Sequence, residues 1–247
     1  MYVPTLKCKE YGYKLNKKIV SRWHPDPYFY HMKKAGGHVA AMRPHVDQSF
    51  LASIDLTKFF TSVSRTRVHR ALCKIGFSNR AALDIATESC VQVGGQKFLP
   101  YGFPQSMLLA TLVFGKSALG AEVRKLRAEG VVITVYVDDI LISSNDIEIL
   151  KVAYDRIVSS IQLSGFEASS DKSEEPDTSI NSFNCNIADR IKIVDERMER
   201  FRQQLAFASP RARDAILRYV GVISTDQAAE LATSPQTSNS STNRAFS

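Results

Sequence analysis

The stretch TVYVDDILIS, residues 134–143, constrains the fold more than any other part of the chain. Its apolar and β-branched residues favour strands on both sides of an adjacent acidic pair, Asp138 and Asp139, which predicts a β-hairpin with the carboxylates at or beside its turn. A solvated turn between edge strands is the plainer interpretation, but both flanks are too apolar for a free edge. We therefore expect two carboxylates close to the core, where an ionised pair repels itself and needs a cation.

A third carboxylate is expected at the end of a neighbouring strand. The segment SFLASIDL predicts a strand that ends near Asp55. If this strand lies beside the hairpin in one sheet, Asp55 joins Asp138 and Asp139. Mg²⁺ prefers oxygen ligands, and two ions about 3.5–4 Å apart are the usual arrangement in phosphoryl transfer. The pattern therefore predicts a three-carboxylate site able to hold two Mg²⁺ ions.

Helix and strand signals alternate along the rest of the chain. Ser64 is expected to cap a helix that Gly76 ends, and Ser78 to begin a helix that reaches about Cys90. A Pro- and Gly-rich loop then leads into one long helix, whose predicted buried stripe is Met107, Ala110, Thr111, Phe114, Ala118 and Leu119. Further helices are expected at residues 146–163, 195–207 and 210–222, and short strands near Phe166 and at residues 191–194.

Composition limits the class of protein. Of the 247 residues, 44% are hydrophobic and 23% charged, as in ordinary globular proteins. The sequence shows neither an apolar run long enough to span a membrane nor the apolar core of a signal peptide. The four cysteines are scattered without a C-x-x-C pair, which favours reduced thiols and a cytoplasmic protein. The net charge of +7 permits a polyanionic partner.

The two ends of the chain differ in character. The first fifty residues mix basic and aromatic side chains, a combination suited to contacts with phosphates and bases. An irregular arm folded over the core is an equally good interpretation of that stretch. Residues 233–247 are polar and low in complexity, so we expect a disordered tail.

Five segments in order resemble motifs of a bacterial reverse transcriptase of the retron and group II intron kind. YVDD matches the Y-x-D-D hairpin of that family, and SIDLTKFFTSV its first palm motif. LPYGFPQSMLLA resembles the L-P-Q-G-x-P-x-S-P segment that holds the nucleotide and template base. SGFEASSDKSEE resembles the following lysine motif, and SFNCNIADRIKI occupies the place of a primer-gripping hairpin. The order and spacing agree over roughly residues 40–205.

The resemblance implies an α+β right-hand polymerase with fingers, a split βαβ palm and a short helical thumb. The implied units are an N-terminal fingers or RNA-contacting segment (1–50), a palm with inserted fingers helices (51–187), and a primer grip with a short thumb (188–232). The implied activity is RNA-directed DNA synthesis by two-metal nucleotidyl transfer. The expected partners are deoxynucleotides, the DNA product and an RNA template, in particular a dedicated non-coding RNA. Antiphage defence follows only by family analogy, and homo-oligomerisation stays open.

The resemblance also assigns roles to individual residues. Asp55, Asp138 and Asp139 are the implied catalytic residues, and together with Leu56 they form the implied metal site. The remaining assignments concern the nucleotide: Phe60 excludes the ribose 2′-hydroxyl, Tyr101 and Gly102 line the pocket, and Arg43 and Lys172 contact the triphosphate. For both Arg43 and Lys172 a solvated surface cation is the alternative.

Four residues, at three places in the chain, depart from the family pattern. Tyr101 stands where glutamine is usual, Met107 replaces a proline, and Asn184-Cys185 replaces a common Leu-Gly. The Tyr101 departure bears on how template and nucleotide are held.

Rival classes fit the sequence less well. Viral-type RNA polymerases commonly carry Gly-Asp-Asp and a second carboxylate at the position of Phe60, and the G-G-D/E-E-F signature of diguanylate cyclases is absent. A catalytically inactive RNA-binding module would gain nothing from clustered buried carboxylates. The five histidines are expected to be structural or exposed, because this chemistry needs no imidazole.

Overall fold

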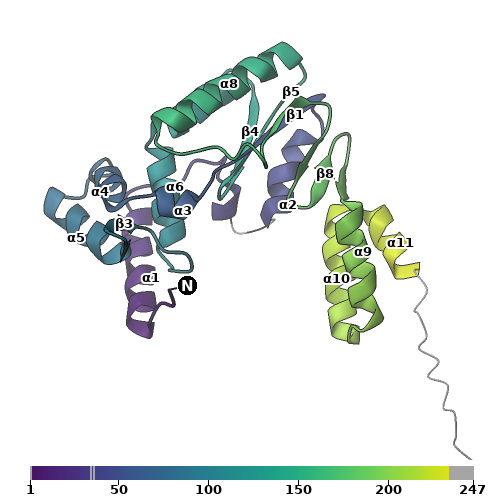
Figure 1. Cartoon of the computed structure of the whole chain (residues 1–247), viewed down its shortest axis with the longest axis horizontal. Helices are drawn as coiled ribbons and strands as arrows, with labels where there is room; N and C mark the ends of the chain where they lie inside the picture. The colour runs from purple at the N-terminus through teal and green to yellow at the C-terminus, as the bar shows by residue number, and fades with distance from the viewer. Residues whose placement is uncertain (1, 34, 36, 234–247) are drawn as a thin grey trace, which may run out of the picture.

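The computed structural model describes residues 2–33, 35 and 37–233, and at its centre is a four-stranded antiparallel sheet (Figure 1). The sheet order is β4-β5-β1-β6, and the strands are β1 (Phe50–Asp55), β4 (Val132–Tyr136), β5 (Asp139–Ser144) and β6 (Glu174–Asp177). Helices separate β1 from β4 and β5 from β6 along the chain, which is the split βαβ arrangement. The predicted hairpin (β4–β5) and the predicted strand before Asp55 (β1) are confirmed.

Helix α8 (Ile147–Leu163) lies along one face of this sheet (Figure 1) and contacts β1, β5 and β6. Asp146 caps its first turn by accepting hydrogen bonds from the amides of Glu148 and Ile149. Gly165 adopts a φ of 67°, the left-handed conformation that commonly follows a helix end. The helix predicted for residues 146–163 is therefore confirmed.

The single long helix predicted after the Pro- and Gly-rich loop is wrong. The chain forms α6 (Ser106–Gly115) and α7 (Ala118–Ala128), bent by 66°. Ser117 caps α7 by accepting a hydrogen bond from the Gly120 amide, and a Cβ at Gly120 would lie 2.5 Å from the Phe114 carbonyl oxygen. This close approach lets α7 turn back over the end of α6. Almost all of α6 is buried, so its buried surface is wider than the predicted stripe of residues. Ala118, which the prediction included in that stripe, is exposed.

The helices are short in comparison with a membrane span. Within the described ranges no single helix is long and apolar enough to cross a membrane. Helices α6 and α7 reach the required length and hydropathy only as a bent pair.

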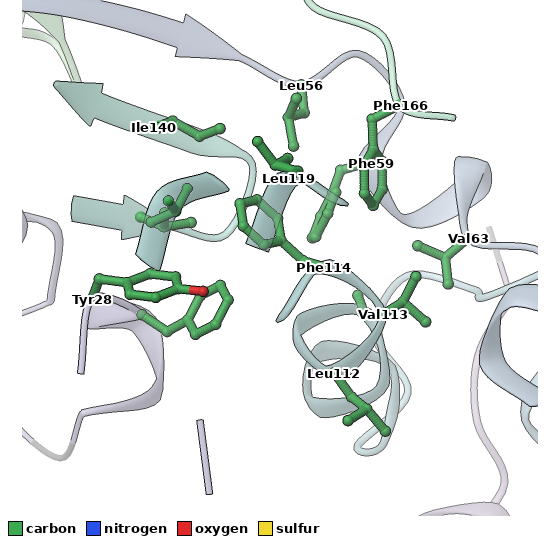
Figure 2. Close-up of a cluster of buried hydrophobic side chains, with 14 of the residues drawn as sticks. Tyr28, Leu56, Phe59, Val63, Leu112, Val113, Phe114, Leu119, Ile140 and Phe166 are labelled. Carbon is green, nitrogen blue, oxygen red and sulfur yellow. The ribbon is translucent and has the colours of Figure 1, made fainter. Parts of the chain in front are cut away.

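The main hydrophobic core lies against the end of β1 that carries Asp55. Figure 2 shows Leu56 and Phe59, which directly follow that strand, beside Phe114 of α6 and Phe166. The ring centroids of Phe59 and Phe166 are 5.6 Å apart, and those of Phe114 and Phe166 are 6.2 Å apart. The backbone on the far side of Asp55 is therefore anchored by buried side chains.

The N-terminal half adds a helical group on one side of the sheet (Figure 1). Its elements are α1 (Leu6–Val20), α4 (Arg65–Cys73), α5 (Asn79–Ser89) and the hairpin of β2 (Val91–Val93) and β3 (Gln96–Phe98). The predicted cap Ser64 and the predicted helix start at Ser78 are confirmed, and each serine accepts a hydrogen bond from the amide three residues on. Trp23, Tyr28 and Phe29 are buried in the core, so these three rings do not form a base-stacking surface.

Short elements link this group to β1. They are the 3₁₀ turns η1 (Tyr30–Met32) and η2 (Arg43–His45) and helix α2 (Gly37–Met42).

The C-terminal part forms a second hydrophobic cluster. Its elements are a three-stranded sheet of β7 (Ile180–Ser182), β8 (Cys185–Ile187) and β9 (Ile191–Ile193) and the helices α9 (Asp195–Ala206), α10 (Pro210–Ile223) and α11 (Thr225–Thr233). The three helices stand side by side beyond β8 (Figure 1). The strand at 191–194 and the helices from 195 and 210 are confirmed, whereas the strand near Phe166 is wrong because only Ala168 forms a single bridge, to Leu56.

Two of the unit boundaries predicted from the sequence, at 187/188 and at 233, fall within this C-terminal part. The division at 187/188 falls between β8 and β9 of one sheet. Thr233, the first residue of the predicted tail, still belongs to α11, and residues 234–247 lie outside the described part of the chain.

Candidate active site

Three carboxylates lie at one end of the central sheet. Asp55 is the last residue of β1 and pairs with Asp139, the first residue of β5. Asp138 occupies the β4–β5 turn, and its carbonyl oxygen accepts a hydrogen bond from the Leu56 amide at 2.9 Å. The sheet register thus places Asp55 beside the hairpin, as the sequence predicts.

The electrostatics of this end favour a cation. Burial raises the pKa of Asp139 to about 7, with a further upward contribution from the negative charges of Asp138 and Asp55. Burial also raises the pKa of Asp138. The nearest compensation comes from Lys172, whose Nζ is 3.9 Å from Asp55 Oδ2 and whose side chain is 71% exposed. Such a distant, solvated ion pair offsets little of the repulsion among the carboxylates.

The donor set fits a hard divalent cation in chemical type. Carboxylate oxygens of Asp55, Asp138 and Asp139 are available, and Leu56, whose side chain is buried, could contribute only its main-chain carbonyl. Among the residues that the structure describes, no three acidic, histidine or cysteine side chains already converge as a metal cluster. A bound cation would favour the ionised form of all three carboxylates.

Phe60 and Tyr101 form a pair of rings near the carboxylates. Phe60 lies in the short helix α3 (Phe59–Ser62) and is only 7% exposed, while Tyr101 is 49% exposed. Their ring centroids are 4.8 Å apart. The pKa of Tyr101 is raised, first by burial and then by the negative charges of Asp138 and Asp55, so its phenol stays protonated at neutral pH. The next residue, Gly102, has a φ of 80°, which favours glycine.

A cavity of about 400 Å³ opens beside Asp55 and Asp139. It is lined by Ser53, Asp55, Asp139, Lys172, residues 181–184 and Val194. Phe183 and Asn184 both have positive φ, of 55° and 58°, as in the tight turns that join two hairpin strands. The β7–β8 turn, predicted to grip a primer, therefore faces the same cavity as the carboxylates.

The structure separates the two predicted triphosphate contacts. Lys172 lies beside Asp55, whereas Arg43 lines a different cavity with Arg190 and residues 221–226. The Arg43 guanidinium donates a hydrogen bond to the Val222 carbonyl oxygen at 3.2 Å. The Arg43 side chain thus contacts the end of α10, and its contact with the triphosphate stays a prediction.

Sequence reasoning missed one residue at this site. Val137, in the turn before Asp138, adopts a φ of 63°, and its amide donates a hydrogen bond to His31 Nδ1 at 2.8 Å. His31 is 106 residues away in the chain, and no pattern near it indicates this contact.

The sheet order, the acidic hairpin opposite Asp55 and the adjoining helical unit α9–α11 define the palm and thumb of a right-hand polymerase (Figure 1). The chain belongs to the reverse transcriptase (RNA-dependent DNA polymerase) family, whose model matches residues 2–187.

The chain is similar to one curated protein in sequence and to a solved structure in fold. It is 25% identical over 173 residues to retron Ec86 reverse transcriptase of Escherichia coli, a match covering 70% of this chain and 52% of that protein. The chain thus spans about half the length of this curated relative. A solved foamy viral protease-reverse transcriptase in complex with an RNA/DNA hybrid superposes with a TM-score of 0.50 at 15% identity, over 95% of this chain and 34% of the other. This second likeness agrees with the fold.

Proposed function

We propose that the chain is an RNA-directed DNA polymerase that copies an RNA template into DNA. The observation that carries the proposal is the pairing of Asp55 with Asp139, next to Asp138, at the end of a palm sheet in a chain of the reverse transcriptase family. Clustered, partly buried carboxylates with raised pKa values are typical of sites that bind cations for chemistry.

Each residue of the site has a separate proposed role in nucleotidyl transfer. Asp55, Asp138, Asp139 and the Leu56 carbonyl would hold Mg²⁺, in two ions by the sequence prediction. When bound, such ions supply charge stabilisation and activate the attacking hydroxyl. Lys172 lies beside Asp55 and would add a positive charge for the nucleotide phosphates. The ring of Tyr101 stacks on the incoming nucleotide or the template base, and Phe60 borders its sugar.

The proposed partners are an RNA template, the DNA product and deoxynucleotides. Exposed lysines Lys7, Lys14 and Lys18 share one face of α1, and Asn16 of the same helix donates a hydrogen bond to the Pro104 carbonyl oxygen at 2.9 Å. Helix α1 therefore adjoins the loop of Tyr101, where its positive charge would attract a nucleic acid backbone. A dedicated non-coding RNA as template and a role in antiphage defence are part of the proposal only by analogy with the retron kind of enzyme that the sequence resembles.

Two further expectations remain predictions. The described cysteines Cys8, Cys73, Cys90 and Cys185 are all free thiols, in keeping with a cytoplasmic location. Self-association stays open and is measured by the mass of the protein in solution.

Primer extension on an RNA template with deoxynucleotides and Mg²⁺ tests the activity. Asp138→Asn and Asp139→Asn should reduce synthesis to background while the proteins stay folded. Asp155→Asn, an exposed position on α8, is the matched control and should match the wild type. Extension by either turn variant at the wild-type rate would refute the proposal. Retained RNA binding without synthesis by the wild type would favour a binding module. Sequencing the RNA that copurifies with the protein tests the non-coding template.

A further inference from the structure

The segment from Tyr28 to His31 runs along the open edge of the central sheet. Strand β4 is the outermost strand on that side, and its Val135 amide donates a hydrogen bond to the Tyr28 carbonyl oxygen at 2.8 Å. Phe29 also forms a parallel bridge with Val135. The segment thus covers part of the β4 edge and places His31 beside the turn that follows β4.

Two hydrogen bonds fix the ring of His31, and a third orients the threonine that accepts one of them. The Val137 amide donates to Nδ1 at 2.8 Å, so Nδ1 carries no proton and Nε2 does. Nε2 then donates to Thr111 Oγ1 at 2.8 Å, and the Thr111 hydroxyl donates to the Met107 carbonyl oxygen at 2.8 Å. The Tyr136 ring meets the His31 ring edge-on, with centroids 6.1 Å apart. Helix α6, through Thr111, therefore holds the imidazole in the orientation that accepts from the turn.

The turn needs such support because of its backbone. Val137 is β-branched and adopts a φ of 63°, a strained conformation that persists only where the surroundings hold it. Asp138 and Asp139 follow immediately, so any relaxation of Val137 changes the direction of both carboxylates. Burial lowers the pKa of His31 to about 4, which keeps the ring in its neutral, accepting form at neutral pH.

We propose, on the basis of the proposed function, that His31 is a positioning residue that fixes Val137 and thereby sets the places of Asp138 and Asp139 for metal binding. His31 acts through the Val137 amide and contacts neither carboxylate by hydrogen bond. A histidine of the N-terminal segment and a threonine of α6 thus help to build the metal site from outside the hairpin.

Two substitutions at position 31 separate positioning from packing. His31→Asn keeps an acceptor, because its Oδ1 is as many bonds from the backbone as Nδ1, whereas His31→Leu fills the space without one. Removing a group that orients metal ligands typically costs about 10–100-fold in metal affinity. We expect His31→Leu to weaken Mn²⁺ binding, measured by electron paramagnetic resonance, and to raise the Mg²⁺ concentration for half-maximal extension by that factor. His31→Asn, which keeps the acceptor, should lose much less metal affinity than His31→Leu.

A second-site substitution tests the strain directly. Glycine adopts positive φ without cost, so Val137→Gly should restore much of the metal affinity lost in His31→Leu. Hydrogen exchange at the residue 137 amide should be faster in His31→Leu than in the wild type or His31→Asn. Unchanged exchange and metal dependence in His31→Leu, beside an active wild type, would overturn the assignment. A wild type that makes no DNA but binds Mn²⁺ in a His31-dependent way would overturn only the proposed function.

Discussion

Asp55 and Asp139 lie directly opposite each other in the β1–β5 ladder, at the last residue of one strand and the first of the other. Like charges at directly opposed positions destabilise a sheet. Burial further disfavours the ionised form of Asp139, so its pKa rises to about 7. The chain therefore keeps an arrangement that lowers its own stability, which is expected where a site must bind a cation.

The first prediction is that Asp139→Asn stabilises the metal-free protein at high pH. The pKa of Asp139 is 3.8 without perturbation and about 7 in the fold, so the native state retains a proton that the unfolded chain releases. Stability therefore falls as the pH rises from about 4 to about 7. Asparagine does not ionise, so the gain at pH 8 should be about 1–3 kcal/mol after allowance for partial exposure, and near zero at pH 4.

Urea unfolding in the presence of a chelator measures this difference at the two pH values. Asp155→Asn, on the surface of α8, provides the control and should change little at either pH. A loss of stability in Asp139→Asn at pH 8 would mean that the carboxylate is well satisfied in the metal-free fold.

The second prediction concerns acid lability at His45. This side chain is fully buried between Ser143 Oγ at 2.6 Å and Thr134 Oγ1 at 2.9 Å, and burial, with a smaller effect of the Arg127 charge, lowers its pKa to about 3. The unfolded chain takes up a proton near pH 6.5 and the native state does not, so stability is lost as the pH falls below about 6.5. The loss should approach about 2 kcal/mol at pH 5.

His45→Gln isolates this contribution, because His31, His38 and Asp139 titrate alike in both proteins. The stability difference between wild type and variant should shrink as the pH is lowered from 8 to 5, as followed by denaturant unfolding. A difference that is independent of pH would contradict the assignment of a neutral, buried His45.

Local patterns predicted the elements around the site well. The continuous apolar and β-branched runs beside the acidic pair and the strand ending at Asp55 were visible because their residues cluster within a few positions. The predicted cap at Ser64 and the predicted helix starts at Ser78 and Asp146 also depend on nearby residues, since each side chain accepts a hydrogen bond from an amide two or three residues away.

What the sequence did not reveal depends on contacts between distant segments. The break between α6 and α7 follows from the approach of Gly120 to Phe114, and β6, with the sequence EEPD, becomes a strand only by pairing with the edge of β1. The link from His31 to Val137 and the engagement of Arg43 by Val222 join residues more than a hundred positions apart. Neither leaves a periodic or motif signal.

The third prediction is that the basic face of α1 contributes to RNA binding. Deleting residues 1–35 is a poor test, because it would remove Trp23, Tyr28 and Phe29 from the core. Lys14→Gln is milder, since Lys14 is exposed on α1. Loss of this positive charge should weaken RNA binding and reduce the magnitude of the slope of log affinity against log salt by about 0.7–0.9. Lys151→Gln on α8, which lies away from α1 in Figure 1, is the control of equal charge, and equal effects of the two would point to non-specific attraction.

The fourth prediction concerns the ring at position 101. Tyr101 is half exposed and rests on Phe60, so its outer face is free to stack on a base. Tyr101→Gln restores the common family residue and should weaken nucleotide affinity by about 1–3 kcal/mol, the usual range for a base–aromatic stack. Tyr101→Phe keeps the ring and should retain most of the affinity. Unchanged KM for nucleotide and unchanged product length in Tyr101→Gln would show that position 101 is merely tolerant.

The last prediction is about sugar choice and depends on Phe60. Its ring is nearly buried, with centroid separations of 5.5 Å to Phe59 and 4.8 Å to Tyr101. In the proposed role beside the sugar, such a ring would offer neither space nor a hydrogen bond to a 2′-hydroxyl. Phe60→Ala opens that space while Asp55 stays in place on β1. Ribonucleotide incorporation should rise by roughly one to two orders of magnitude, about 1–3 kcal/mol at about 1.4 kcal/mol per decade.

The same substitution also removes core volume, and a large-to-small change at a buried ring costs about 3–5 kcal/mol of stability. Phe59→Leu is the matched control, because Phe59 is fully buried beside it and packs on Phe166. Single-nucleotide extension with dNTP and rNTP should show altered selectivity in Phe60→Ala alone. If Phe60→Val, which removes less volume, also leaves selectivity unchanged in a folded and active protein, Phe60 is a core residue and another group excludes ribose.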